Sequence, residues 1–135
     1  GRICEKNEAN RLIKYLTSSN ELEIIEYSKW ILSINEERKL LTKTFSDSFD
    51  TSVLGNSSSI VTICDTKEGI IGLIANRFLN MFNVPSIAFA VDSKDENVLK
   101  GSARSKAGFS IVEAYKDESI SKYLITSGGH AYAGG

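Results

Sequence analysis

Positive charge without any acidic residue is concentrated in one block of the sequence, residues 100–108. The block combines three cations with small and hydroxyl residues: Lys100, Gly101, Ser102, Arg104, Ser105, Lys106 and Gly108. Small residues let a backbone approach an anion, hydroxyls donate hydrogen bonds, and the planar Arg guanidinium matches phosphate oxygens. In a strand, Ser102 and Arg104 project from the same face because side chains alternate with period two. The pair predicts a phosphate-binding site; the alternative is a solvent-exposed strand end with ordinary charges.

A second candidate site lies at residues 127–131, which contain the one histidine of the chain. Gly128 and Gly129 lead into a helix that we expect to begin near His130. A helix start presents unpaired backbone N–H groups and the positive end of the helix dipole, so it suits an anion, with the imidazole as a further donor. The alternative is that His130 is an ordinary turn or core residue.

The sequence lacks the common catalytic motifs. It has no Walker loop, no GxGxxG, HExxH or GxSxG motif, and no Asp/His cluster typical of paired catalytic metals. Cys4 and Cys64 are far apart and only one histidine is present, so this chain alone cannot assemble a structural zinc site. We therefore expect no catalytic and no metal-binding residue in this segment, and infer that it is not self-sufficient for catalysis.

Two helices are predicted before these candidate sites. Apolar residues recur with helical spacing over residues 9–16, and again over residues 24–45 within a longer helix of about 25 residues. Asn20 is the expected N-cap of the long helix, and Glu23 stands where a capping box needs it. Arg38 interrupts the apolar stripe, so either the stripe turns to solvent there or Arg38 meets an acidic partner.

A polar segment at residues 46–59 separates these helices from a second half with a different pattern. β-rich runs at residues 60–64 and 87–91 flank a helical pattern at residues 69–82, which predicts a parallel crossover. A third strand is expected to open at residues 98–100, and a short helix is expected at residues 111–115. We predict an α/β fold in which N-terminal helices (1–50) precede a small mixed β-sheet domain flanked by helices (51–135).

Length and composition limit the class of protein. A chain of 135 residues suffices for one domain whose core needs no metal or disulfide. The 16 basic and 17 acidic residues exclude a globally basic nucleic-acid coat, although they are compatible with a local basic patch. No apolar run approaches the roughly 20 residues of a membrane span, and no signal sequence is visible, so we expect a cytoplasmic protein without a membrane partner. The missing initial Met and the stop at Gly135 suggest a piece of a longer protein.

Several motifs in order resemble the RecJ family over essentially the whole chain. They are Gly-Arg at 1–2, Asn-Glu-Glu-Arg at 35–38, Glu-Gly-Ile-Ile-Gly-Leu-Ile-Ala-Asn-Arg at 68–77, Gly-Ser-Ala-Arg-Ser at 101–105, Gly-Phe at 108–109 and Gly-Gly-His-Ala at 128–131. The resemblance implies a 5′-to-3′ exonuclease specific for single-stranded DNA, acting in DNA repair and recombination. In that family a DHH domain binds manganese or magnesium, and a long helix joins it to a DHH-associated domain. By this resemblance, residues 1–50 are the helical connector and residues 51–135 are the DHH-associated, substrate-binding domain, while the metals belong to the missing DHH domain.

The resemblance also implies substrate-binding roles for individual residues. Ser102 and Arg104 match the family's Gly-Ser-x-Arg pattern, which helps to bind the 5′-terminal phosphate. Gly128, Gly129 and His130 match the glycine-rich His motif that borders the active-site cleft, with Ser127 in place of its usual first glycine. Arg2 matches an Arg at the entry to the connecting helices and is expected to face the DNA backbone. Relatives often carry Trp-His before the Gly69 motif, where this chain has Thr66 and Lys67.

Two other functions stay open at this point. The same superfamily contains phosphodiesterases of short oligonucleotides or cyclic dinucleotides, which pair a DHH domain with a domain of this kind. A third possibility is a non-catalytic nucleic-acid-binding scaffold whose metal domain has lost its ligands.

Overall fold

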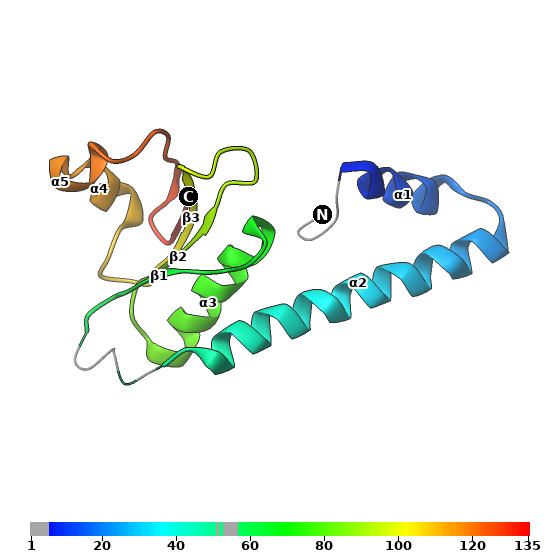
Figure 1. The fold of residues 1–135 in the computed structure, drawn as a ribbon, viewed down its shortest axis with the longest axis horizontal. Coiled ribbons are helices and arrows are strands. Elements are labelled where there is room, and N and C mark those ends of the chain that lie inside the picture. The colour runs from blue at the N-terminus through cyan, green and yellow to red at the C-terminus, as the bar shows by residue number, and fades with distance from the viewer. Residues whose placement is uncertain (1–5, 51, 53–56) are drawn as a thin grey trace.

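Two N-terminal helices are followed by a small α/β domain in the computed structural model, which describes residues 6–50, 52 and 57–135 (Figure 1). α1 (Lys6–Thr17) and α2 (Glu21–Ser48) form a helical hairpin, and the C-terminal end of α2 packs against the domain. In chain order the domain contains β1 (Ile60–Ile63), a 3₁₀ turn (Glu68–Ile70), α3 (Ile71–Phe82), β2 (Ser86–Val91), β3 (Leu99–Arg104), α4 (Ile111–Lys116), α5 (Glu118–Ser121), β4 (Gly129–His130) and β5 (Ala133–Gly134).

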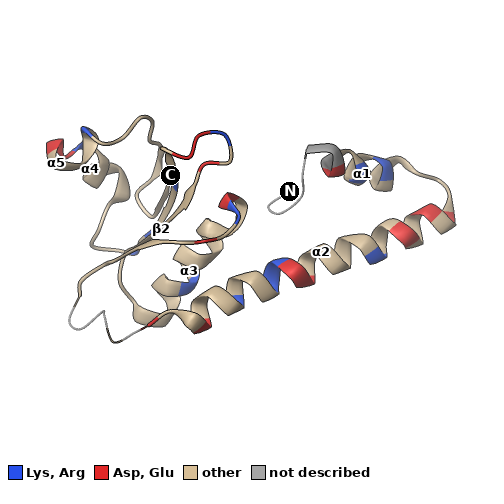
Figure 2. Ribbon diagram, in the orientation of Figure 1, with Lys and Arg blue, Asp and Glu red and all other residues tan. Residues whose placement is uncertain are grey.

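α2 begins at the N-cap that the sequence predicts. The Asn20 side-chain oxygen accepts hydrogen bonds from the backbone N–H groups of Leu22 (3.0 Å) and Glu23 (3.4 Å), which have no partner within the helix. The capping interaction differs from the two reciprocal hydrogen bonds of a capping box. The Ser18 hydroxyl donates to the Glu23 carboxylate (2.7 Å) and accepts from the Asn20 N–H (3.1 Å), so it bridges the two. Beyond this start α2 runs for 28 residues and carries both signs of charge along its length (Figure 2).

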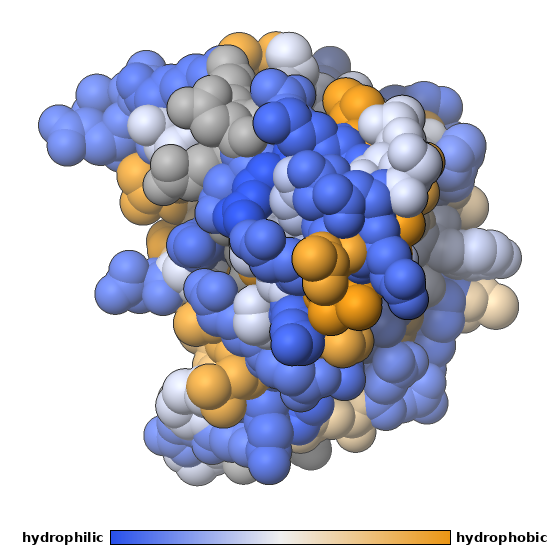
Figure 3. Space-filling view, turned by 90° about the vertical axis from the view of Figure 1, so that its right-hand side faces the viewer, coloured by the Kyte–Doolittle hydropathy of each residue, from blue (hydrophilic) through white to orange (hydrophobic). Residues whose placement is uncertain are grey.

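The α1–α2 hairpin is held by an aromatic contact and leaves apolar groups exposed. The Arg11 guanidinium lies over the Trp30 ring, 4.6 Å from its centroid, a geometry that favours cation–π attraction. Leu16 and Leu22, beside the connection, are 78% and 77% exposed. Figure 3 views the molecule from this end, where apolar groups stand among hydrophilic ones. Among the described helices, α2 included, none combines the length and apolar character that a membrane span requires.

The sheet is mixed and has the strand order β1-β2-β3-β5-β4. β1 and β2 are parallel, as expected for two strands joined through α3, and the other pairs are antiparallel. The predicted α/β class, with helices before a small mixed sheet, is confirmed. The third strand begins where the sequence predicts, and its register with β2 continues through the small residues to Arg104.

α3 covers one face of the sheet and forms the core with it. Phe78 of α3 is fully buried, and its ring contacts that of Phe49, which follows α2, with centroids 4.6 Å apart. Burial of these apolar surfaces is the main source of stability for such a layer. α3 is thereby held between the sheet and the end of α2, which fixes the position of its first turn. The buried core residues around it are Ile60, Cys64, Ile70, Ile71, Ile74, Ala75, Ala88 and Ala90.

Candidate nucleic-acid interface

Ser102 and Arg104 lie side by side on β3, on the sheet face that α3 covers. Their register partners in β2, Ala88 and Ser86, are both buried. The Arg104 guanidinium donates through Nη1 to the Ser102 hydroxyl oxygen (3.0 Å) and to the carbonyl oxygen of Ala103 (2.6 Å). Within residues 6–50, 52 and 57–135, Arg104 has no acidic side chain at ion-pair distance. A half-buried guanidinium beside a hydroxyl, with its charge uncompensated, is suited to a phosphate.

Gly72, in the first turn of α3, brings this helix directly against the Ser102–Arg104 pair. A Cβ at this buried position would lie 2.9 Å from Ser102 Oγ and 3.0 Å from Arg104 Nη2. Real Cβ atoms do not approach other atoms so closely, so only glycine leaves the pair in place. The first turn of α3 therefore forms a wall behind the pair, and the sequence shows no signal for this contact beyond the glycine itself.

Lys100, which lies on the same face of β3, is already paired with acidic residues. Its Nζ lies 2.9 Å from Glu68 Oε2 and 3.2 Å from Asp92 Oδ2. Glu68 and then Asp92 raise the pKa of Lys100, while the backbone N–H of Lys94 and then Lys100 lower the pKa of Asp92. The block at residues 100–108 contains no acidic residue, but the fold brings acidic side chains to it from two other segments. Lys100 is thus an ion-pair residue, and Lys106 lies beyond the strand on the exposed turn before α4.

The expectation of a helix at His130 is wrong. Residues 128–135 form a tight β-hairpin in which Gly128 and Gly135 exchange two backbone hydrogen bonds of 2.9 Å. Gly129 adopts φ = 143°, and a Cβ there would overlap the carbonyl oxygen of Ala133, so the hairpin requires glycine. The helix expectation failed because two glycines signal a turn without telling which element follows it. An anion bound next to His130 would therefore contact the edge of a β-hairpin and an imidazole, and not the N-terminus of a helix.

The hairpin nevertheless brings His130 to the same face as Arg104. Ala133 of β5 is the register partner of Arg104 on one side and of His130 on the other. Register partners point to the same side of a sheet and adjacent strands are about 4.8 Å apart, so the two Cα atoms lie about 10 Å apart. His130 is exposed. Ser102, Arg104 and His130 thus share one wall, whereas Arg2 lies outside the described residues.

Arg38 is half-buried, lines the space between α2 and α3, and has no acidic partner among the described residues. Arg77 of α3 lines the same space and forms an ion pair with Asp47 of α2 (3.2 Å). Lys67, which precedes the 3₁₀ turn, lies 3.7 Å from Glu37 of α2. Sequence reasoning missed this inter-helix group, since only the packing of α2 on α3 assembles it.

The described residues do not offer a metal site. They contain no group of three or more His, Cys, Asp or Glu side chains placed to hold an ion. Cys64 is 2% exposed, and burial raises the pKa of its thiol to about 11, which disfavours the thiolate that a metal needs. We assign metal binding to none of the residues that the structure describes.

The DHHA1 domain family matches residues 56–135, which is more than half of the chain. The chain belongs to this family. The match covers the strands and helices that carry the Ser102–Arg104 pair and the hairpin with His130.

The relatives extend the likeness to the N-terminal helices and confirm the resemblance to RecJ. The single-stranded-DNA-specific exonuclease RecJ of Bacillus subtilis is 27% identical over 139 residues, which cover 100% of this chain and 17% of that protein. RecJ of Haemophilus influenzae is 36% identical over 73 residues, 53% of this chain and 12% of that protein. The crystal structure of RecJ from Thermus thermophilus in complex with Mg²⁺ superposes with a TM-score of 0.76 at 24% identity, over 95% of this chain and 20% of that one. The chain thus spans about a sixth of the Bacillus relative, and the fold is that of the RecJ structures.

Proposed function

We propose that this chain is the substrate-binding portion of a RecJ-type exonuclease that degrades single-stranded DNA from its 5′ end. In this proposal residues 1–50 are the connector from a DHH domain, and residues 51–135 hold the strand and its 5′ phosphate. The observation that carries the proposal is the Ser102–Arg104 pair, with its 3.0 Å hydrogen bond and its uncompensated charge. Membership of the DHHA1 family and the similarity to RecJ proteins support the choice of substrate.

The chemistry of the pair fits a terminal phosphate better than an internal one. A 5′-terminal phosphate carries more negative charge than a phosphodiester and presents three free oxygens. One guanidinium and one hydroxyl on the same strand face can meet two of these oxygens from one side. Gly128, Gly129 and His130 lie along the same wall, where the exposed imidazole offers a further donor to the strand.

Cleavage is assigned to the DHH domain and not to this chain. The RecJ structures that this fold matches are bound to Mg²⁺ or to manganese, whereas the described residues provide no ligand set of their own. The residues described above bind and orient the end of the strand, and we assign none of them a catalytic role. In the proposed enzyme, the wall with Arg104 holds the strand while hydrolysis occurs at the facing domain.

The proposal is tested by the variant Arg104→Ala in the protein that joins this chain to its DHH domain. Hydrogen bonds to charged groups contribute about 1.5–3 kcal/mol, so the preference for 5′-phosphorylated over 5′-hydroxyl single strands should fall about tenfold or more. Lys122→Ala, an exposed cation outside the site, is the matched control and should leave the preference unchanged. The measurement is the rate of degradation of the two substrates, with the unfolding midpoint followed by circular dichroism.

Three outcomes would contradict the proposal. Equal loss of rate on both kinds of end would mean that Arg104 does not recognise the terminal phosphate. Turnover restricted to dinucleotides or cyclic dinucleotides would indicate a phosphodiesterase. Binding of single strands without any hydrolysis in the presence of manganese would indicate a scaffold.

A further inference from the structure

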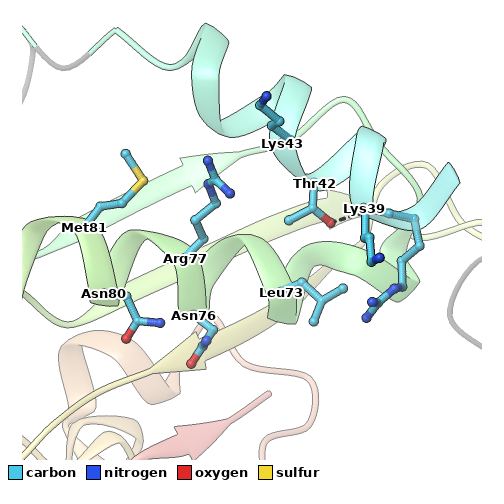
Figure 4. A pocket seen from close by; sticks show the side chains of 9 residues that line it. Lys39, Thr42, Lys43, Leu73, Asn76, Arg77, Asn80 and Met81 are labelled. Atoms are coloured by element: carbon cyan, nitrogen blue, oxygen red, sulfur yellow. Dashed lines mark hydrogen bonds between the residues drawn. The ribbon is translucent and has the colours of Figure 1, made fainter. Parts of the chain in front are cut away.

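A basic groove separates α2 from α3 on the flank of α3 that does not face the sheet. It encloses about 540 Å³ and is lined by Arg38, Lys39, Thr42, Lys43, Leu73, Asn76, Arg77, Asn80 and Met81 (Figure 4). Four of these nine residues are cationic and none is acidic. The apolar part of the lining comes from Leu73 and Met81.

The positive charge of the groove is only partly compensated. Glu36 pairs with Lys39 (2.8 Å) and Asp47 pairs with Arg77 (3.2 Å), but Arg38 and Lys43 have no acidic partner in the described part of the chain. The Nε atoms of Arg38 and Arg77 are buried and make no hydrogen bond to any described residue. Burial of an unpaired N–H donor on a charged group is costly, so the described fold leaves both guanidinium groups incompletely compensated.

Residues of α3 line the groove and also contact the Ser102–Arg104 pair. Asn76 lies one helical turn after Gly72, which contacts the pair, and residues four apart are neighbours on a helix surface. Figure 4 shows Arg77 pointing toward α2, whereas Asn76 and Asn80 point away from it. A strand that extends from the pair to the groove would pass the exposed amide groups of Asn76 and Asn80. This path is about one helix diameter long, about 10 Å, and ends at the cations of the groove.

The lining also indicates which part of a nucleic acid would bind. None of the nine described residues that line the groove is aromatic, so they offer no platform for base stacking. Arginine forks and a lysine without stacking partners are suited to the phosphates of a sugar–phosphate backbone, which carry no sequence information.

We propose that the α2–α3 groove binds internal backbone phosphates of the single strand whose 5′ end lies at Ser102 and Arg104. This inference rests on the proposed function for the identity of the strand. It adds a second contact point, independent of the 5′ phosphate and indifferent to base sequence. Arg38 and Lys43 are the principal contacts, and Arg77 contributes through the nitrogen atoms that Asp47 does not engage.

The test is a salt titration of binding by fluorescence anisotropy, with the 135-residue chain and an oligothymidylate of about a dozen nucleotides, a length within the usual range of single-strand sites. For single strands the logarithm of affinity falls with the logarithm of salt by about 0.7 per neutralised phosphate. The double variant Arg38→Gln/Lys43→Ala should therefore reduce the slope by about 1.4, equally on 5′-phosphorylated and 5′-hydroxyl strands. The single variant Lys43→Ala, at an exposed position, should reduce the slope by about 0.7. It keeps the test valid if the double variant misfolds.

The matched control removes two charges from the same helical hairpin outside the groove, as Lys14→Ala/Lys29→Ala. An unchanged slope in the groove variants, or an equal reduction in the control, would overturn the proposal. It would also be overturned if polyglutamate of similar charge displaced the strand as well as unlabelled DNA does, because the groove would then suit acidic proteins. The two proposals fail separately: Arg104→Ala changes the preference between 5′ ends, whereas the groove variants change the salt slope at both ends.

Discussion

Replacement of Gly72 by alanine tests whether the first turn of α3 holds the Ser102–Arg104 pair in its binding geometry. The added Cβ would lie 2.9 Å from Ser102 Oγ and 3.0 Å from Arg104 Nη2, closer than real contacts allow. Both neighbours are atoms at the ends of side chains, so they can shift by a few tenths of an ångström without moving the backbone. The displacement would break the alignment of the pair while leaving the sheet and the helix intact.

The effect on stability should be small and the effect on binding large. Alanine is favoured over glycine in helices by about 1 kcal/mol, and overpacking costs about 1–3 kcal/mol, so the free energy of unfolding should fall by about 0–2 kcal/mol. Loss of the charge-assisted contacts should cost about 1.5–3 kcal/mol, which is tenfold or more in the preference for a 5′ phosphate. Urea unfolding followed by circular dichroism measures the first quantity, and anisotropy with 5′-phosphorylated and 5′-hydroxyl strands measures the second.

Ser102→Ala provides the background that separates steric from functional effects. It removes the hydroxyl that stands closest to the new methyl group, so Gly72→Ala should be less disruptive to stability in that background than in the parent chain. The preference for a 5′ phosphate should be low in both single variants and in the double variant. If Gly72→Ala lowered stability by several kcal/mol and left the end preference unchanged, glycine would serve packing alone and the assignment of the pair would be refuted.

Two further predictions concern the hairpin and the buried thiol. Gly129→Ala should strongly destabilise the β4–β5 hairpin because of its φ of 143° and the overlap with Ala133, whereas Gly128→Ala, with open space around its Cβ position, should be tolerated; comparison of the two unfolding midpoints decides this. In a Cys4→Ser background, Cys64 should react with a thiol reagent near neutral pH only after unfolding, because its pKa is raised to about 11. The pKa of the Cys64 thiol is higher in the folded protein than in the unfolded chain. The free energy of unfolding should therefore be constant below the pKa of the unfolded thiol and should decline as the pH rises toward 11. Rapid labelling of the native protein would contradict both statements.

The elements of this fold were largely predictable because their signals are local. The N-cap at Asn20 depends on a side chain and backbone groups within three residues, and the strands and helix from residue 60 to residue 91 follow from apolar periodicity and from Pro85. The hairpin at residues 128–135 was not predictable in the same way. Its strands are two residues long, and pairing with β3 decides their conformation.

In the candidate site, too, features with a local signal were predictable and features that depend on tertiary contacts were not. That Ser102 and Arg104 share a face follows from the alternation of a strand, and the sequence alone was sufficient to propose it. The sequence alone could not tell which cations are free, because an ion pair depends on residues that are distant in the chain. Lys100 is compensated by Glu68 and Asp92, whereas Arg104 has no such partner among the described residues.

The sequence by itself determined the two N-terminal helices, the strand–helix–strand unit at residues 60–91, and the presence of a serine and an arginine suited to phosphate. Only the tertiary structure placed His130 on the face of Arg104, set Gly72 against the pair, and assembled the basic groove from Arg38 and its neighbours. The physical reason is that periodicity and capping act over a few residues, whereas the charge and shape of a binding surface arise where segments far apart in the chain pack together.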